Sequence, residues 1–155
     1  MALESMLASA WALEVNTGTE GAPNWVAVKG LTSFKESIES SMEDDSDFDS
    51  DGWGSDQVTQ RKWKLECEAK RKKQTGSPTF IPDPGQQFVL NAGNLVGVGS
   101  NVQIRYFRRD GDEQAWSGYV SVEYKGGGGE VKVLEPFSFI LHGQGERTPI
   151  TNPAA

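Results

Sequence analysis

The sequence predicts a mainly β fold with one helix: an antiparallel β-sandwich or open barrel of about six to seven strands, with the α-helix packed on its flank. The chain has 155 residues, about the length of one domain. Its 18 glycines and seven prolines mark many turns, which favours short strands. Alternating apolar and polar residues recur along the chain, and one clear segment has helical spacing. We therefore expect a single domain over residues 1–155.

The N-terminal part contains two short predicted strands. Apolar residues in 1–13 recur at helical spacing, which is compatible with a short helix or with an arm that becomes ordered against a partner. Strands are expected at 25–29 and 31–38, with Gly30 between them as a bulge or bend.

The clearest strand pattern covers residues 57–72. One face is apolar and the other is charged, as in a long strand that is buried on one side only. The apolar face carries Trp63, Leu65, Cys67 and Ala69, and the polar face carries Lys62, Lys64, Glu66, Glu68 and Lys70. A loop is expected from 72 to 84.

A helix is expected after Asp83, an N-cap residue followed by Pro84 at the first helical position. Its apolar stripe runs from Phe88 to Val96, and Gly97 and Gly99 end it. Strands are then predicted at 102–109, 116–124, 130–134 and 137–141, with turns at 110–111 and 126–129, and a polar tail follows over 143–155.

Composition argues against several function classes. The net charge of −7 argues against tight binding of DNA phosphates, although DNA could pass nearby without adhering. The single cysteine and single histidine provide neither a disulfide framework nor a zinc site. We expect no membrane span, no secretion signal, no cofactor and no catalytic motif, hence a soluble non-enzyme made in a cytoplasm.

A strongly acidic stretch, Met42–Asp56, has seven acidic residues and no basic residue, and we expect a long acidic loop over 42–57. The spacing of Asp47, Asp49 and Asp51 before Gly52 matches the first half of an EF-hand loop. The twelfth position of that loop should be a glutamate but is Val58, and the flanks are strand-like. These aspartates are therefore weak metal candidates, and a solvated loop between strands is favoured.

Three segments together carry a resemblance to a known family: the run from Trp25 to Phe34, the acidic run from Glu43 to Asp56, and the run from Phe139 to Pro153. The chain resembles the major tail tube protein of long-tailed, siphovirus-type bacteriophages, especially those of actinobacteria. The resemblance implies a non-enzymatic virion protein, made in the host bacterial cytoplasm, that forms hexameric rings. It further implies that the rings stack into the hollow tail tube through which DNA reaches the host.

The resemblance also implies partners. These are other copies of the chain and the tape-measure, baseplate and tail-terminator proteins, with DNA passing through the lumen without specific binding and with no membrane insertion. The acidic loop is the expected contact between copies, with a basic run as its acceptor. The expected contact residues are Asp44, Asp45, Asp47, Phe48, Asp49, Asp51 and Trp53, facing Lys70, Arg71, Lys72 and Lys73 of a neighbour.

Two alternatives remain open from the sequence. A calcium- or carbohydrate-binding β-sandwich module could use the acidic run or the tryptophans, although Trp25, Trp63 and Trp116 alternate with core residues and are expected to be structural. The second alternative is the inner tube of a phage-derived injection device, which would assemble by the same physical principles as a phage tail tube.

Overall fold

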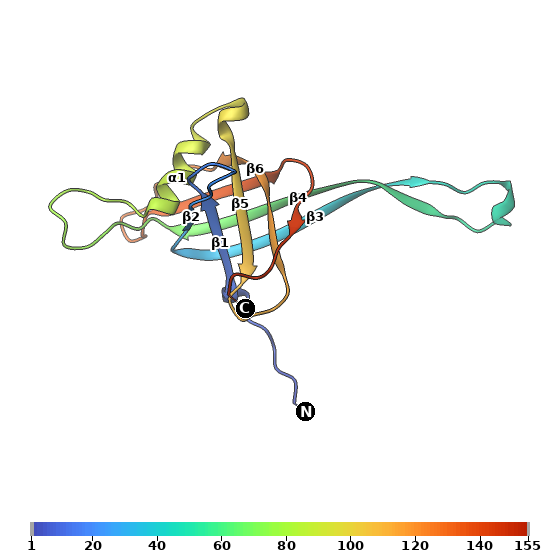
Figure 1. Ribbon diagram of the computed structural model, residues 1–155, viewed down its shortest axis with the longest axis horizontal. Helices are drawn as coiled ribbons and strands as arrows, with labels where there is room; N and C mark the ends of the chain where they lie inside the picture. The colour runs from blue at the N-terminus through green and yellow to red at the C-terminus, as the bar shows by residue number, and fades with distance from the viewer. Residues whose placement is uncertain (1, 155) are drawn as a thin grey trace.

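The computed structural model describes residues 2–154 and contains one curled antiparallel sheet of eight strands with an α-helix on its flank (Figure 1). The predicted fold class is confirmed. The strands are β1 (Trp11–Asn16), β2 (Trp25–Ala27), β3 (Leu31–Asp44), β4 (Asp56–Lys70), β5 (Asn101–Arg108), β6 (Ala115–Tyr124), β7 (Pro136–Gly143) and β8 (Thr148–Pro149). The helix is α1 (Pro84–Gly93), and three 3₁₀ turns are η1 (Ala8–Ala10), η2 (Phe48–Ser50) and η3 (Gly97–Ser100).

The sheet curls so that its two ends approach each other without pairing. Its strand order is β2-β1-β5-β6-β7-β4-β3, and β8 pairs with β6 outside this path. The rings of Trp11 on β1 and Phe34 on β3 nevertheless stack with centroids 5.4 Å apart, and both rings lie 5.8 Å from that of Tyr106 on β5. Because strands near opposite ends of the order share one aromatic cluster, the sheet encloses the core as an open barrel.

The core is built from alternate residues of the strands, as the pattern over 57–72 predicts. Trp63, Leu65, Cys67 and Ala69 are 7, 0, 2 and 3% exposed, so this face of β4 is buried. Leu13, Ile104, Val120, Phe139 and Leu141 meet them from β1, β5, β6 and β7.

The helix begins as predicted and ends earlier. Asp83 Oδ2 accepts a hydrogen bond of 3.1 Å from the Gln86 N–H, and Pro84 is the first helical residue. Gly85 and Gly93 allow close packing, because a Cβ would lie 2.1 Å from the Ala27 carbonyl oxygen or 2.7 Å from Tyr124 Cβ. The helix ends at Gly93 and not at Gly97, since the expected stripe residues beyond it, Leu95 and Val96, lie in solvent.

Other expected boundaries differ from the structure. Residues 11–13 of the expected helix or arm belong to β1, which pairs with β5. The expected strand over 130–134 is a turn with exposed Val131 and Val133, since it lies in the loop that joins the paired strands β6 and β7. The expected loop over 42–57 shrinks to 45–55, because β3 and β4 stay paired as far as Asp44 and Asp56.

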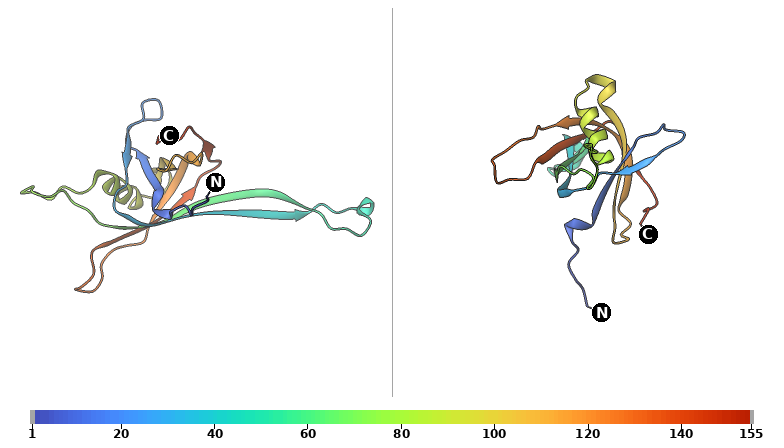
Figure 2. Two further views of the ribbon diagram at one scale, coloured as in Figure 1. Left: turned by 90° about the horizontal axis from the view of Figure 1, so that it is seen from below. Right: turned by 90° about the vertical axis from the view of Figure 1, so that its left-hand side faces the viewer.

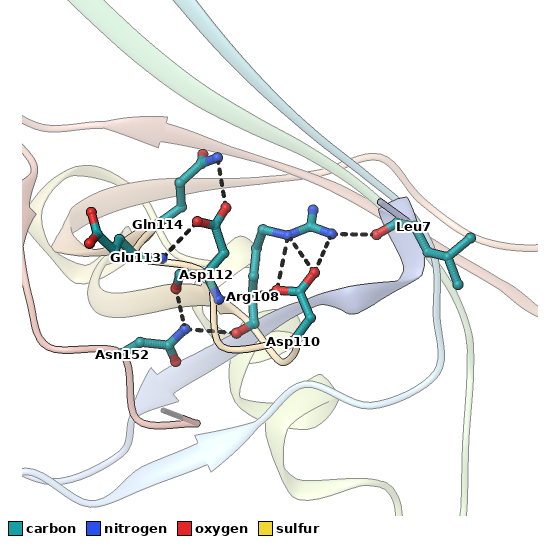
Figure 3. Close-up of polar contacts among 7 residues, drawn as sticks. All are labelled: Leu7, Arg108, Asp110, Asp112, Glu113, Gln114 and Asn152. Carbon is teal, nitrogen blue, oxygen red and sulfur yellow. Dashed lines mark hydrogen bonds and ion pairs between the residues drawn. The ribbon is translucent and has the colours of Figure 1, made fainter. Parts of the chain in front are cut away.

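The two terminal segments are anchored on the turn between β5 and β6 (Figure 3). Arg108 donates 2.7 Å to the Leu7 carbonyl, forms an ion pair of 2.9 Å with Asp110 and lies over the Trp11 ring. Asn152 Nδ2 donates to the carbonyls of Arg108 and Asp112, at 2.8 and 2.6 Å. Within the expected polar tail over 143–155, residues 148–152 are therefore attached to the sheet.

Candidate assembly surfaces

A two-stranded arm projects from the barrel. Strands β3 and β4 continue well beyond the other strands and carry the turn η2 at their far end (Figures 1 and 2). Every residue from 39 to 62 except Ser50 is exposed. An isolated two-stranded ribbon has little stability in water, because nothing covers either face. The arm is therefore the part of the molecule that most clearly lacks a partner.

One face of the arm is apolar. Ile38, Met42 and Val58 are 47, 52 and 40% exposed. Ile38 pairs with Trp63 and Met42 pairs with Val58, and residues directly opposite each other in a ladder share a face. Because residues 38 and 42 also share a face of β3, the apolar face of the barrel continues out along the arm.

A bulge in β4 maintains this face. Ser41 pairs with Gln60 but Met42 pairs with Val58, so Thr59 is an extra residue, and its hydroxyl donates 3.2 Å to the Ser41 carbonyl. Without the bulge Val58 would lie opposite Glu43 and point to the other face.

The tip of the arm, residues 45–55, is a structured acidic turn. Asp47 caps η2 through a 2.9 Å hydrogen bond from the Asp49 N–H, and Asp51 adopts a positive φ of 53°. Hydrogen bonds from Ser46 lower the pKa of Asp44 at the start of the tip. Phe48 and Trp53 are 105 and 81% exposed, so two large aromatic side chains lie in solvent among carboxylates.

The predicted basic acceptors lie at the other end of the hairpin. Asp56 and Lys70 are 14 residues apart on one extended strand, which is about 47 Å. The tip therefore cannot reach them within one copy. Arg71 is also occupied locally: it donates 2.5 Å to Gln87 Oε1 and 3.3 Å to Gln86 Oε1, and lies over the Phe137 ring. Lys73 pairs with Pro82 at the start of the loop that follows.

A groove lies where the arm leaves the barrel. We call it the root groove; its volume is about 650 Å³, and its lining is Ile38, Arg61, Lys62, Trp63, Trp116, Gly145, Glu146 and Arg147. Sequence reasoning missed it because four separate segments form it: Ile38, residues 61–63, Trp116 and residues 145–147. The only sequence signal is the apolar–basic alternation of β4, which does not reveal the contribution from residues 145–147.

A partly buried polar cluster shapes the groove. Glu36 accepts hydrogen bonds from Arg147 and, at 2.5 Å, from the Tyr106 hydroxyl. Burial raises the pKa of Tyr106, and the hydrogen bond to Glu36 adds to the shift. The Arg147 guanidinium carbon lies 3.9 Å from the ring centroid of Trp116. These contacts hold the C-terminal segment against the root of the arm.

The geometry does not favour the alternative binding modules. In residues 2–154 no three His, Cys, Asp or Glu side chains group as metal ligands, and the aspartates of the tip lie between strands. Trp63 is buried, Trp25 is covered by Arg105 at 4.6 Å and Trp116 by Arg147, so these rings form no flat sugar platform. None of the helices in the described residues has the length and apolar character to cross a membrane.

The whole chain can be compared with known proteins. No protein-family model and no curated protein sequence matches it. Among solved structures it is similar to a chain from the tail of an empty gene transfer agent particle, computed with helical refinement and C6 symmetry. The TM-score is 0.62 at 12% identity, over 94% of this chain and 99% of the other. A chain from the virion of a native gene transfer agent particle gives a TM-score of 0.61 at 10% identity, over 93 and 98%. The protein therefore shares the fold of chains from these particles.

Proposed function

We propose that this chain is a structural virion protein that assembles into hexameric rings, and that these rings stack into the hollow tail tube through which DNA is delivered. The observation that carries the proposal is the unpartnered arm on a fold shared with a chain of a C6-symmetric tail. A ribbon with an exposed apolar face and an aromatic tip has a physical reason to bind a neighbouring copy. The proposed location is the virion tail, after synthesis in the host bacterial cytoplasm.

Sheet edges give a second reason for ring formation. The outer edge of β3 is unpaired along the strand within the described residues, and β2 forms the opposite edge. Exposed edges present backbone N–H and C=O groups that can pair with another sheet, and closing a ring removes them. Lateral pairing within a ring and arm contacts between rings would then use different surfaces.

The uncovered face of the sheet fits a channel wall that releases DNA. Opposite charges lie across from each other on this face: Lys35 is opposite Glu66 and Glu39 is opposite Lys62 in the ladder, and Lys64 forms an ion pair of 3.3 Å with Glu66. A wall of interspersed positive and negative charges on an acidic protein has no surplus of cations to retain phosphates. Tape-measure, baseplate and tail-terminator proteins are the further partners that this function requires.

Negative-stain electron microscopy of the concentrated protein tests the proposal. We expect hollow tubes of uniform diameter with sixfold averages in end-on views. A chain that lacks residues 47–53 should stay folded, by circular dichroism, and form no tubes. Val131→Ser, at an exposed turn outside the arm, is the control and should assemble normally. Failure of the wild-type chain to assemble, even on isolated tail ends, would falsify the proposal.

A further inference from the structure

The root groove and the tip of the arm are complementary surfaces on the same chain. We infer that the acidic, aromatic tip (residues 45–55) of one copy docks in the root groove of a second copy. The inference rests on the proposed function, because it names the surface that receives the arm during assembly. It moves the acceptor from Lys70–Lys73 to the groove around Arg61 and Trp116.

The groove offers apolar surface of suitable size. Ile38 is 47% exposed at its edge, and the rings of Trp63 and Trp116 form part of its wall. Its volume of about 650 Å³ lies within the range of pockets that bind small organic groups, about 300–1,000 Å³. Phe48 and Trp53 are the aromatic side chains of the tip, and both are exposed. Burying them in the groove would remove the largest apolar surface that the tip exposes to water.

The charges of the two surfaces are opposite. The tip and its flanks carry seven carboxylates and no basic residue between 42 and 56. Arg61, Lys62 and Glu146 line the groove, and none of them forms an ion pair with any residue between 2 and 154. Arg147 is already paired with Glu36, so the unpaired cations of the groove outnumber its unpaired carboxylate by two to one. Lys62 lies opposite Glu39, but Arg61 lies opposite Ser40 and so has no carboxylate facing it. Arg61 is therefore the cation best placed to receive an aspartate of the tip.

The occupant must come from another copy. The arm is an extended ladder from the Ile38–Trp63 pair to the Asp44–Asp56 pair, and six residues of strand cover about 20 Å. The tip starts at that distance from its own groove and points away from the barrel (Figure 2). An antiparallel ribbon cannot bend back on itself without breaking its ladder of hydrogen bonds.

The predicted run Lys70–Lys73 is a weaker acceptor. Arg71 is already hydrogen-bonded to Gln86 and Gln87, and the backbone N–H of Lys72 donates to Gln86. The root groove, in contrast, combines unpaired cations with tryptophan side chains in its lining. A tip that carries both carboxylates and aromatic rings matches the groove on both counts.

The contact would be heterologous. Each copy has one tip and one groove at different places, so each copy can bind one neighbour through its tip and another through its groove. Such a contact continues from copy to copy and does not close on a pair. Two copies with complementary defects, one in the tip and one in the groove, would therefore form a single contact and stop.

Site-specific cross-linking tests the inference on the full chain. One variant carries Trp53→Cys and a second, tagged for size, carries Ile38→Cys. The only native thiol, Cys67, is 2% exposed and burial raises its pKa, so it should not react. A short bis-maleimide should give a hetero-dimer band from the mixture and little from either variant alone. Val131→Cys, 104% exposed on another loop, replaces Ile38→Cys as the matched control and should give no band.

The outcomes separate the inference from the proposed function. Three results would contradict docking in the root groove while leaving the proposed tube assembly unaffected. The first is tubes that form without the Trp53→Cys to Ile38→Cys cross-link. The others are equal cross-linking to Val131→Cys and equal cross-linking between two tips. Formation of the cross-link without tubes would support docking of the tip in the root groove and would contradict assembly into a tube. The absence of both would overturn both.

A charge exchange provides an independent test. Arg61→Glu should raise the protein concentration needed for assembly on the order of tenfold, while circular dichroism stays unchanged because the side chain is exposed. Asp49→Arg in the same chain should restore assembly. Arg109→Glu, which changes an exposed arginine directly after the C-terminal end of β5, is the control and should assemble normally. No effect of Arg61→Glu, or rescue by neither Asp49→Arg nor Asp47→Arg, would contradict the inference.

Discussion

The indole of Trp63 lies against Gly143 so closely that a Cβ at residue 143 would come within 2.4 Å of its Nε1 and Cε2 atoms. The same indole donates a 2.8 Å hydrogen bond to the Gly145 carbonyl. The end of β7 and the segment that follows it can therefore cover the root of the arm only because residue 143 has no side chain.

Gly143→Ala should lower the free energy of unfolding by about 1–3 kcal/mol, because the added methyl group forces the indole out of its place. Urea unfolding followed by tryptophan fluorescence measures the loss. Gly21→Ala is the matched control, because no heavy atom lies within 4 Å of its added Cβ and it should change stability little. Equal effects of the two substitutions would show that the indole has room to move.

Gln86→Leu should be among the more destabilising single substitutions. The side-chain amide is fully buried, donates to the carbonyls of Lys29 and Lys70, and accepts from the Lys72 N–H at 2.8 Å. Losing it leaves buried backbone groups without partners, at a cost of about 2–4 kcal/mol in the free energy of unfolding. Gln87→Leu, one residue along and less buried, should cost about 1 kcal/mol or less. A cost below 1 kcal/mol at residue 86 would contradict the assignment of its amide as the link between α1 and β4.

Stability should fall at alkaline pH partly through Tyr106. Burial raises the pKa of this phenol, and the hydrogen bond to Glu36 raises it further. Above about pH 10 the tyrosine of the unfolded chain loses its proton whereas folded Tyr106 keeps it. The unfolded state then binds fewer protons, so the free energy of unfolding decreases as pH rises, by up to about 1.4 kcal/mol per pH unit from this residue.

Urea unfolding of the wild type and of Tyr106→Phe between about pH 9 and 11 measures this slope. The variant should be less stable at neutral pH but should lose less stability on alkalinisation. Lysine titration contributes to both proteins and cancels in the difference. Parallel slopes would mean that Tyr106 ionises in the folded state as easily as in the unfolded chain.

Asn152→Ala should cost about 1–2 kcal/mol of unfolding free energy, since it removes hydrogen bonds to the carbonyls of Arg108 and Asp112. Amide hydrogen exchange should also rise in the segment 148–153, at the backbone N–H groups of Thr148, Ile150 and Thr151, because β8 pairs with β6 through two residues only. Asn101→Ala, at an exposed position, is the control and should leave both measurements close to the wild type. Unchanged exchange at 148–153 in Asn152→Ala would show that this segment is held by other contacts.

The sequence predicted most of the sheet and the start of the helix because those features depend on local patterns. The alternation around Leu65 and the Asp83–Pro84 pair need no knowledge of distant residues. The acidic run 42–44 is predicted to be loop because carboxylates have low strand propensity, but its pairing with 56–58 overrides this propensity. The pattern at 130–134 alternates like that of a strand, yet the segment lies in the loop between the paired strands β6 and β7.

The candidate site was harder to predict than the fold. The tip is a continuous segment with a distinctive composition, so the sequence pointed to it directly. The root groove joins β4 to Trp116 and to Arg147, which lie more than fifty residues further along the chain. Its existence depends on the curl of the sheet and on the Glu36–Arg147 contact, neither of which leaves a local signal.

The bulge at Thr59 limits the lengths that the arm can have. One extra residue in β4 keeps Val58 on the face of Met42, so adding one residue to each strand beyond the bulge would turn the tip to the opposite face. Adding two to each strand would restore the face and lengthen the arm by about 7 Å. Arms that reach the same kind of neighbour should therefore differ in length by even steps, and adding residues in such pairs would change the axial repeat of the proposed tube.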